Sequence, residues 1–191
     1  FPKAIFPGDY PDPSILRDGK DYYMTHSPFY YAPGFLIWHS TDLMHWEPVC
    51  RALPEYEGSA MAPDLLKYQG RYYIYYPTST GENYVIYADN IRGPWSKPVK
   101  LDVKGIDPGH VVGEDGKRYL FTNNGWITPL SDDGLKVTGK SRKVYDGWEY
   151  PGNWVTEGKD MYLESPKLLY KDGYYYMISA EGGTAGPATS H

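Results

Sequence analysis

Short apolar runs alternate with turn residues along the chain, and four stretches repeat the same order. Each has a proline, an apolar run, a turn with glycine, and a second apolar run rich in tyrosine. An Asp-Gly or similar pair between two apolar runs predicts a β-hairpin. The stretches are residues 12–27, 62–79, 107–123 and 164–183. The predicted turns are Asp18-Gly19, Gln69-Gly70, Asp115-Gly116 and Asp172-Gly173.

A second pattern follows each of the first two hairpins. Residues 35–48 and 84–98 each contain an apolar run, a polar turn and a tryptophan shortly before a proline. These segments add two predicted strands to each unit, which makes four. The prolines that open the units stand at 13, 63, 108 and 166, so the spacings are 50, 45 and 58 residues. A four-stranded unit of this length favours β-propeller blades, and a β-sandwich of similar hairpins is the alternative.

The fold class we expect is therefore all-β, with blades that start near residues 12, 62, 107 and 164. Four blades of this size need about 200 residues, and the fourth unit contains one predicted hairpin. We expect residues 1–191 to be part of a single propeller catalytic domain and to hold about three and a half blades. The remaining blades would come from the rest of the polypeptide or from another chain.

Composition excludes several classes of function. The formal net charge of -5 gives no basic surface for nucleic acid, and no apolar run is long enough to span a membrane. Cys50 is the single cysteine, which excludes an internal disulfide framework and a cysteine-rich metal cluster. The 21 tyrosines fit strands, while the 21 glycines and 17 prolines fit many turns.

Three acidic residues stand where predicted first strands begin. Asp12 and Asp107 directly precede a proline, and Glu164 lies two residues before Pro166. First strands line the central channel of a propeller, so we expect the three carboxylates to share one position of the repeat and to gather at one rim. Like charges held close together separate their pKa values, as a general acid and base beside a glycosidic bond require. The alternative is that Asp-Pro merely forms turns, and Asp9 is a rival for the base.

Aromatic side chains near the ends of the hairpins are candidates for stacking on the apolar faces of sugars. We expect Phe29, Tyr30 and Trp126 to bind substrate, whereas most other tryptophans and tyrosines would pack between blades. His110 is a further candidate for the substrate site, although it could instead bind an ion or water, or simply form hydrogen bonds within the fold.

Four blocks of the sequence together resemble glycoside hydrolase family 43. They are GDYPDPS at residues 8–14, APDL at 62–65, IDP at 106–108, and LESP at 163–166 with EGGT at 181–184. The resemblance implies a five-bladed β-propeller that hydrolyses plant-type polysaccharide or oligosaccharide side chains with inversion. The typical activities are exo-acting α-L-arabinofuranosidase and β-xylosidase. It also implies a secreted or periplasmic enzyme that requires no cofactor. Met61 departs from the pattern, because many members have tryptophan there.

The same resemblance implies roles for individual residues. Asp12 corresponds to the general base, Glu164 to the general acid, and Asp107 to a third carboxylate that orients the acid. His191 matches a histidine near a channel water or calcium ion, so it is the candidate ligand for a structural calcium. Two rival functions stay open: a non-catalytic carbohydrate-binding propeller, and a retaining five-bladed enzyme that acts on fructans.

Overall fold

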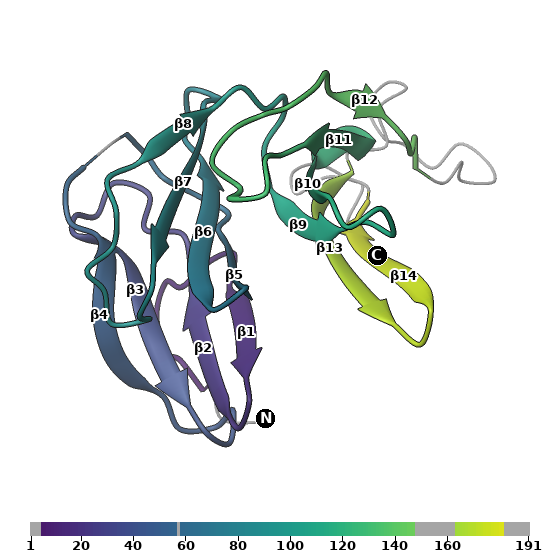
Figure 1. Cartoon of the computed structure of the whole chain (residues 1–191). Helices are drawn as coiled ribbons and strands as arrows, with labels where there is room; N and C mark the ends of the chain where they lie inside the picture. The colour runs from purple at the N-terminus through teal and green to yellow at the C-terminus, as the bar shows by residue number, and fades with distance from the viewer. Residues whose placement is uncertain (1–4, 57, 148–162, 182–191) are drawn as a thin grey trace, which may run out of the picture. The chain divides into compact units, whose positions relative to one another are not determined.

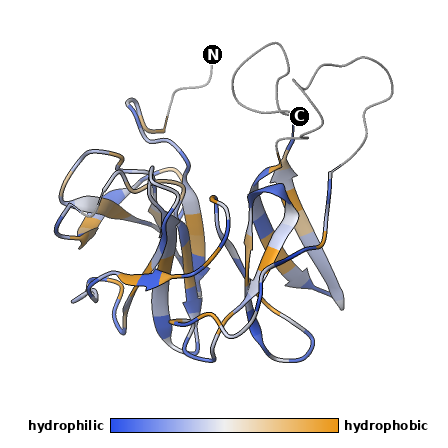
Figure 2. Cartoon of the chain, turned by 90° about the horizontal axis from the view of Figure 1, so that it is seen from above, coloured by the Kyte–Doolittle hydropathy of each residue, from blue (hydrophilic) through white to orange (hydrophobic). Residues whose placement is uncertain are grey.

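The structure is a computed structural model, and it describes residues 5–56, 58–147 and 163–181 (Figure 1). The chain divides into two compact units, Phe1–Lys100 and Leu101–His191, and each is described by itself. Hydrophobic and hydrophilic residues alternate in short stretches along the strands and loops (Figure 2). No helix in the described part of the chain is long and apolar enough to cross a membrane.

The first unit contains two four-stranded sheets in which each strand pairs with its neighbour in chain order. The first sheet consists of β1 (Ser14–Asp18), β2 (Asp21–Thr25), β3 (Gly34–Ser40) and β4 (Glu47–Leu53). The second consists of β5 (Asp64–Tyr68), β6 (Arg71–Pro77), β7 (Asn83–Ala88) and β8 (Val99–Leu101), the last of which reaches the first residue of the second unit. Both sheets match the predicted unit of four strands.

The second unit contains another four-stranded sheet and a hairpin. The sheet consists of β9 (Gly109–Val112), β10 (Arg118–Thr122), β11 (Trp126–Pro129) and β12 (Arg142–Lys143), with the short 3-10 helix η1 (Asn123–Gly125) before β11. The hairpin consists of β13 (Glu164–Lys171) and β14 (Tyr174–Ala180). Strand β13 packs beside β9 and β10. Apart from η1, every regular element among the described residues is a strand, as predicted.

Two of the four predicted turns are confirmed at the residues named. Gln69-Gly70 and Asp172-Gly173 are the two-residue loops of their hairpins, and both positions of each loop have positive φ, as a type I′ turn requires. The third hairpin instead has a five-residue loop, residues 113–117, with Asp115-Gly116 inside it.

The first predicted turn is wrong by one residue. Asp18 is the last residue of β1, and the loop is Gly19-Lys20 with positive φ at Gly19. The type II′ turn places its glycine first, which leaves Asp18 in the strand. There its carboxylate accepts hydrogen bonds from Lys67 Nζ at 2.7 Å and from Tyr72 Oη at 2.6 Å. These contacts join the two sheets of the first unit.

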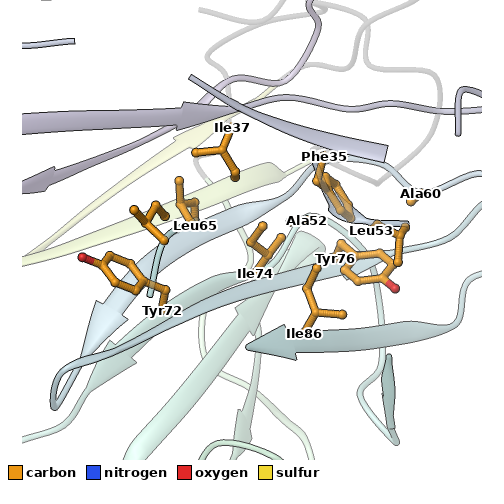
Figure 3. Close-up of a cluster of buried hydrophobic side chains, with 11 residues drawn as sticks. Phe35, Ile37, Ala52, Leu53, Ala60, Leu65, Tyr72, Ile74, Tyr76 and Ile86 are labelled. Carbon is orange, nitrogen blue, oxygen red and sulfur yellow. The ribbon is translucent and has the colours of Figure 1, made fainter. Parts of the chain in front are cut away.

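The hydrophobic core of the first unit lies between its two sheets (Figure 3). Ile74 and Tyr76 point from β6 to the same side, because side chains alternate along a strand, and both are fully buried. Strands β3 and β4 supply the facing side chains. The cluster comprises Phe35, Ile37, Ala52, Leu53, Ala60, Leu65, Tyr72, Ile74, Tyr76, Ile86 and Ile91.

Candidate active site

The residue directly before each unit's opening proline has a left-handed backbone. The φ angles are 52° at Asp12, 40° at Ala62, 58° at Asp107 and 50° at Ser165. Residues other than glycine rarely adopt positive φ, and such positions cluster at functional sites. Asp12 and Asp107 thus occupy one position of the repeat, as predicted. The prediction is wrong for Glu164, because Ser165 takes the shared position and Glu164 lies one residue earlier.

A buried serine holds the carboxylate of Asp12. The hydroxyl of Ser27, which follows β2, donates a hydrogen bond to Asp12 Oδ2. The backbone amide of Ser27 donates to the carbonyl of Pro11 at 2.9 Å. Ser27 is 3% exposed, while Asp12 is exposed. The serine therefore fixes both the backbone before Asp12 and one oxygen of its side chain, and it leaves the aspartate open to solvent.

The same hydroxyl connects Asp12 to the next sheet. The backbone amide of Ala62, which takes the equivalent position before Pro63, donates to Ser27 Oγ at 2.6 Å. By contrast, Asp9 is exposed and makes no hydrogen bond or ion pair with any residue that the structure describes. Of the two rival candidates for a base, Asp12 is therefore the one that the fold holds in place.

In the second unit, Asp107 lies beside the start of β13. Its Oδ2 accepts a hydrogen bond from the backbone amide of Ser165 at 3.3 Å. Ser165 directly follows Glu164, which is half-buried and whose carbonyl accepts a hydrogen bond from the Ser179 hydroxyl at 2.9 Å. The structure thus brings Asp107 to the backbone that carries Glu164.

A close approach of two strands makes this arrangement possible. Strand β9 runs beside β13 (Figure 1), and a Cβ atom at Gly109 would lie 1.8 Å from the carbonyl oxygen of Pro166. Only glycine fits there, because any other residue would overlap the Pro166 backbone. Lys167 adds a second link, since its Nζ donates to the carbonyl of Pro108 at 2.9 Å. Glycine at 109 therefore allows Asp107 and Ser165 to meet.

Asp12 belongs to the first unit, whereas Asp107 and Glu164 belong to the second. The structure accordingly gives the surroundings of each group separately. That the three carboxylates gather at one rim stays a prediction.

The predicted sugar-binding aromatics differ in how much of each ring is free. Tyr30 is 76% exposed. Phe29 is half-buried, with a φ of 46°, and its amide donates to the Ala60 carbonyl at 3.0 Å. Trp126 opens β11, and Lys104 Nζ lies 3.9 Å from its ring centroid in a cation–π contact. A sugar would therefore have to use the other face of Trp126.

His110 in β9 forms a hydrogen bond inside the second unit. Its Nε2 accepts from Arg118 Nε at 2.9 Å, and Arg118 is 1% exposed. This nitrogen is therefore engaged within the fold. The contact itself is that of a histidine that stabilises the fold, which was one of the predicted alternatives.

A second histidine directly precedes Ser27 in the chain. His26 is 8% exposed, its Nδ1 lies 3.2 Å from the Ser27 carbonyl, and burial lowers the pKa of its imidazole. The ring packs edge-on against Tyr10, with centroids 5.0 Å apart. His26 is therefore a neutral packing residue beside the serine that holds Asp12.

The predicted calcium ligand, His191, lies outside the described residues. Within residues 5–56, 58–147 and 163–181, no group of three or more histidine, cysteine, aspartate or glutamate side chains could hold a metal ion. The structural calcium ion stays a prediction.

Comparison with known proteins gives consistent matches. The sequence matches the family model described as glycosyl hydrolases family 43 over residues 1–191. It is 34% identical over 207 residues to a xylosidase/arabinosidase of Butyrivibrio fibrisolvens, covering 95% of this chain and 38% of that protein. It is 36% identical over 211 residues to a xylan 1,3-beta-xylosidase of a Vibrio species, covering 94% of this chain and 38% of that protein.

Solved structures show the same fold. The crystal structure of the K247S mutant of the family 43 protein BlXynB from Bacillus licheniformis matches with a TM-score of 0.82 and 32% identity, covering 100% of this chain and 43% of that one. The fold is that of a five-bladed β-propeller, of which the described residues form three four-stranded blades and two strands of a fourth. This confirms the predicted fold class. The chain spans about 38% of the length of the curated relatives named above.

Proposed function

Because the chain belongs to glycosyl hydrolase family 43, we propose that it carries the acidic residues of an inverting glycoside hydrolase. The observation that carries this proposal is the shared backbone position of Asp12 and Asp107, whose carboxylates accept hydrogen bonds from Ser27 and Ser165, respectively. Strained positions persist only where the surrounding structure determines them, and here they present carboxylates.

The proposed reaction is a single displacement at the anomeric carbon. Asp12 takes a proton from a water molecule, whose oxygen bonds to the anomeric carbon as the glycosidic bond breaks. Glu164 gives its proton to the departing oxygen. Asp107 is the positioning residue for the acid, and its hydrogen bond to the amide next to Glu164 supports that role. The hydrogen bond that Ser27 donates to Asp12 holds one carboxylate oxygen in place, which supports the role of a positioned base.

The proposed substrates are the terminal α-L-arabinofuranosyl or β-xylosyl groups of plant-type polysaccharides or oligosaccharides. The two curated relatives described above carry the names of xylosidases, and one also carries that of an arabinosidase. A screen of 4-nitrophenyl α-L-arabinofuranoside, β-xyloside and β-galactoside with the full-length polypeptide tests this choice. Hydrolysis of the first or second is expected. Binding of these sugars with no turnover would instead support a carbohydrate-binding propeller.

The stereochemistry separates this proposal from the retaining alternative. Proton NMR during the first turnovers should show a product anomer opposite to that of the substrate. In a structure of the full-length polypeptide, the carboxyl groups of Asp12 and Glu164 should then lie about 6.5–9.5 Å apart. An initial product with unchanged configuration would refute inversion, and a retaining enzyme would have the two groups about 5–5.5 Å apart.

We further propose that residues 1–191 belong to a single catalytic domain that other blades complete, and that the enzyme is secreted or periplasmic. The share of the relatives' length that this chain spans supports the first point. The second point depends on the proposed substrate, since a plant-type polysaccharide would be met outside the cell. Fractionation of cells that express the full-length protein tests its location.

A further inference from the structure

One buried hydroxyl group lies between the proposed base and the backbone of the next sheet. Ser27 Oγ donates to Asp12 Oδ2 and accepts the amide of Ala62 at 2.6 Å. We infer that Ser27 is the positioning residue of the general base, and that it acts by holding one carboxylate oxygen of Asp12 in place. This inference rests on the proposed function, because it assigns to Asp12 the activation of water.

The direction of the hydroxyl proton follows from the two contacts. A backbone amide can only donate, so Ala62 must use a lone pair of Ser27 Oγ. The hydroxyl has a single proton, and the carboxylate of Asp12 is the acceptor that the geometry offers it. With the amide of Ala62 on one of its lone pairs, the hydroxyl directs its proton to Oδ2 of Asp12. This hydrogen bond fixes the position of Oδ2.

The contact also gives the two carboxylate oxygens of Asp12 different surroundings. Oδ2 is held by Ser27, whereas Oδ1 has no hydrogen-bond partner among the residues that the structure describes. Because Asp12 is exposed, Oδ1 is open to water. One oxygen is therefore fixed to the protein, and the other is left to accept the proton of the attacking water.

The first unit offers a closely matched control for Ser27. Ser14 is also buried, with 5% exposure against 3% for Ser27. Its Oγ accepts the amide of Leu65 at 2.9 Å, much as Ser27 accepts that of Ala62. Ser14 makes no hydrogen bond to Asp12. Replacing either serine by alanine leaves one amide of the second sheet without its partner, but only the Ser27 change removes a donor from the proposed base.

The test compares Ser27→Ala, Ser14→Ala and Asp12→Asn with the wild type in the full-length polypeptide, on the aryl glycoside that the wild type hydrolyses. Both serine variants should show a similar fall in Tm. Ser27→Ala alone should lower kcat/KM roughly 10-fold to 100-fold, and the loss should fall on kcat rather than on KM, since the base loses its orientation.

Leaving-group dependence provides a second readout. If Ser27 acts through the base, Ser27→Ala should slow a 4-nitrophenyl and a 2,4-dinitrophenyl glycoside by the same factor, because water must be activated for both. Values of kcat and KM for Ser27→Ala that match those of Ser14→Ala would overturn the inference. So would a loss confined to the poorer leaving group. Full activity of Asp12→Asn, or an inactive wild type, would instead overturn the proposed function and this inference with it.

Discussion

Replacing Gly109 by alanine tests whether the approach of β9 to β13 builds the acid side of the site. A Cβ at this position would lie 1.8 Å from the Pro166 carbonyl oxygen and 2.9 Å from its carbon. Real contacts of this kind begin near 3.0 Å, so one strand must move by about 1.2 Å. The obstacle is backbone, which cannot rotate away as the end of a side chain can.

A displacement of that size should harm catalysis more than folding. It would pull Ser165 away from Asp107, and the contact between them is already 3.3 Å long. We expect kcat/KM of the full-length enzyme to fall at least about 100-fold, because a misplacement of about 1 Å can cost that factor. Forcing an extra methyl group into a packed contact should also lower the free energy of unfolding by about 1–3 kcal/mol.

Activity assays and thermal melts of Gly109→Ala and a control variant measure both effects. Gly139→Ala is the matched control, since Gly139 is in the same unit and a Cβ there would meet a side-chain carbon of Pro129 at 3.0 Å rather than backbone. The control should remain close to the wild type in rate and Tm. If Gly109→Ala keeps the wild-type kcat/KM and Tm, then the contact between β9 and β13 does not position the acid, and the reasoning is refuted.

Three further predictions concern the acid, the joint between sheets and the hairpin of the second unit. Glu164→Ala should lower the rate about 10²–10⁴-fold on a natural glycoside but much less on a 2,4-dinitrophenyl glycoside, because dinitrophenolate leaves without a proton. Asp12→Ala should slow both substrates by a similar factor. If Glu164→Ala slows both substrates equally, Glu164 is not the acid. The hydrogen bonds from Lys67 and Tyr72 hold the pKa of Asp18 below its ordinary value. The stability that they add is therefore fully present above the unfolded-state pKa of about 3.9, and it is lost as the pH falls through the lower pKa of the folded state. Asp18→Asn should therefore lower the free energy of unfolding at pH 7 by up to about 1 kcal/mol and remove this pH dependence. Chemical denaturation between pH 7 and pH 2 measures this, and the free energies of unfolding of the variant and the wild type should converge at the acid end. Four large apolar or aromatic side chains of the hairpin β13–β14 are exposed: Leu169 (58%), Tyr174 (68%), Tyr176 (51%) and Ile178 (77%). Residues 1–191 expressed alone should therefore aggregate or show a broad thermal transition. A sharp, reversible transition of a monomer would contradict this.

The fold could be predicted from the sequence because strands and turns carry local signals. Alternating apolar runs and glycine-containing pairs predicted all four first hairpins, and two of the turns fall at the residues named. The turn near Asp18 differs from the prediction because a type II′ turn places Gly19 first and leaves Asp18 in the strand. Asp18 binds Lys67 and Tyr72 from the next sheet, and no pattern in its own hairpin indicates that.

Residues of the candidate site could be predicted from the sequence only where a local sequence pattern marks them. Asp12 and Asp107 have one, because an acid before a proline recurs at the repeat spacing. Ser27 has none: a serine after a strand is ordinary, and its partners lie 15 and 35 residues away. Gly109 is one of 21 glycines, and its importance depends on the backbone of a strand far along the chain.

These contacts suggest why the proposed carboxylates depend on the blades beside them. In the first unit, the amide of Ala62 fixes the hydroxyl that holds Asp12. In the second unit, the amide of Ser165 binds Asp107 directly. Ala62 and Ser165 take the same place before a proline, and each belongs to the sheet that follows the acid it holds. Each aspartate is thus oriented by the start of the next blade, so a change that separates two neighbouring blades should disturb catalysis before it exposes the core.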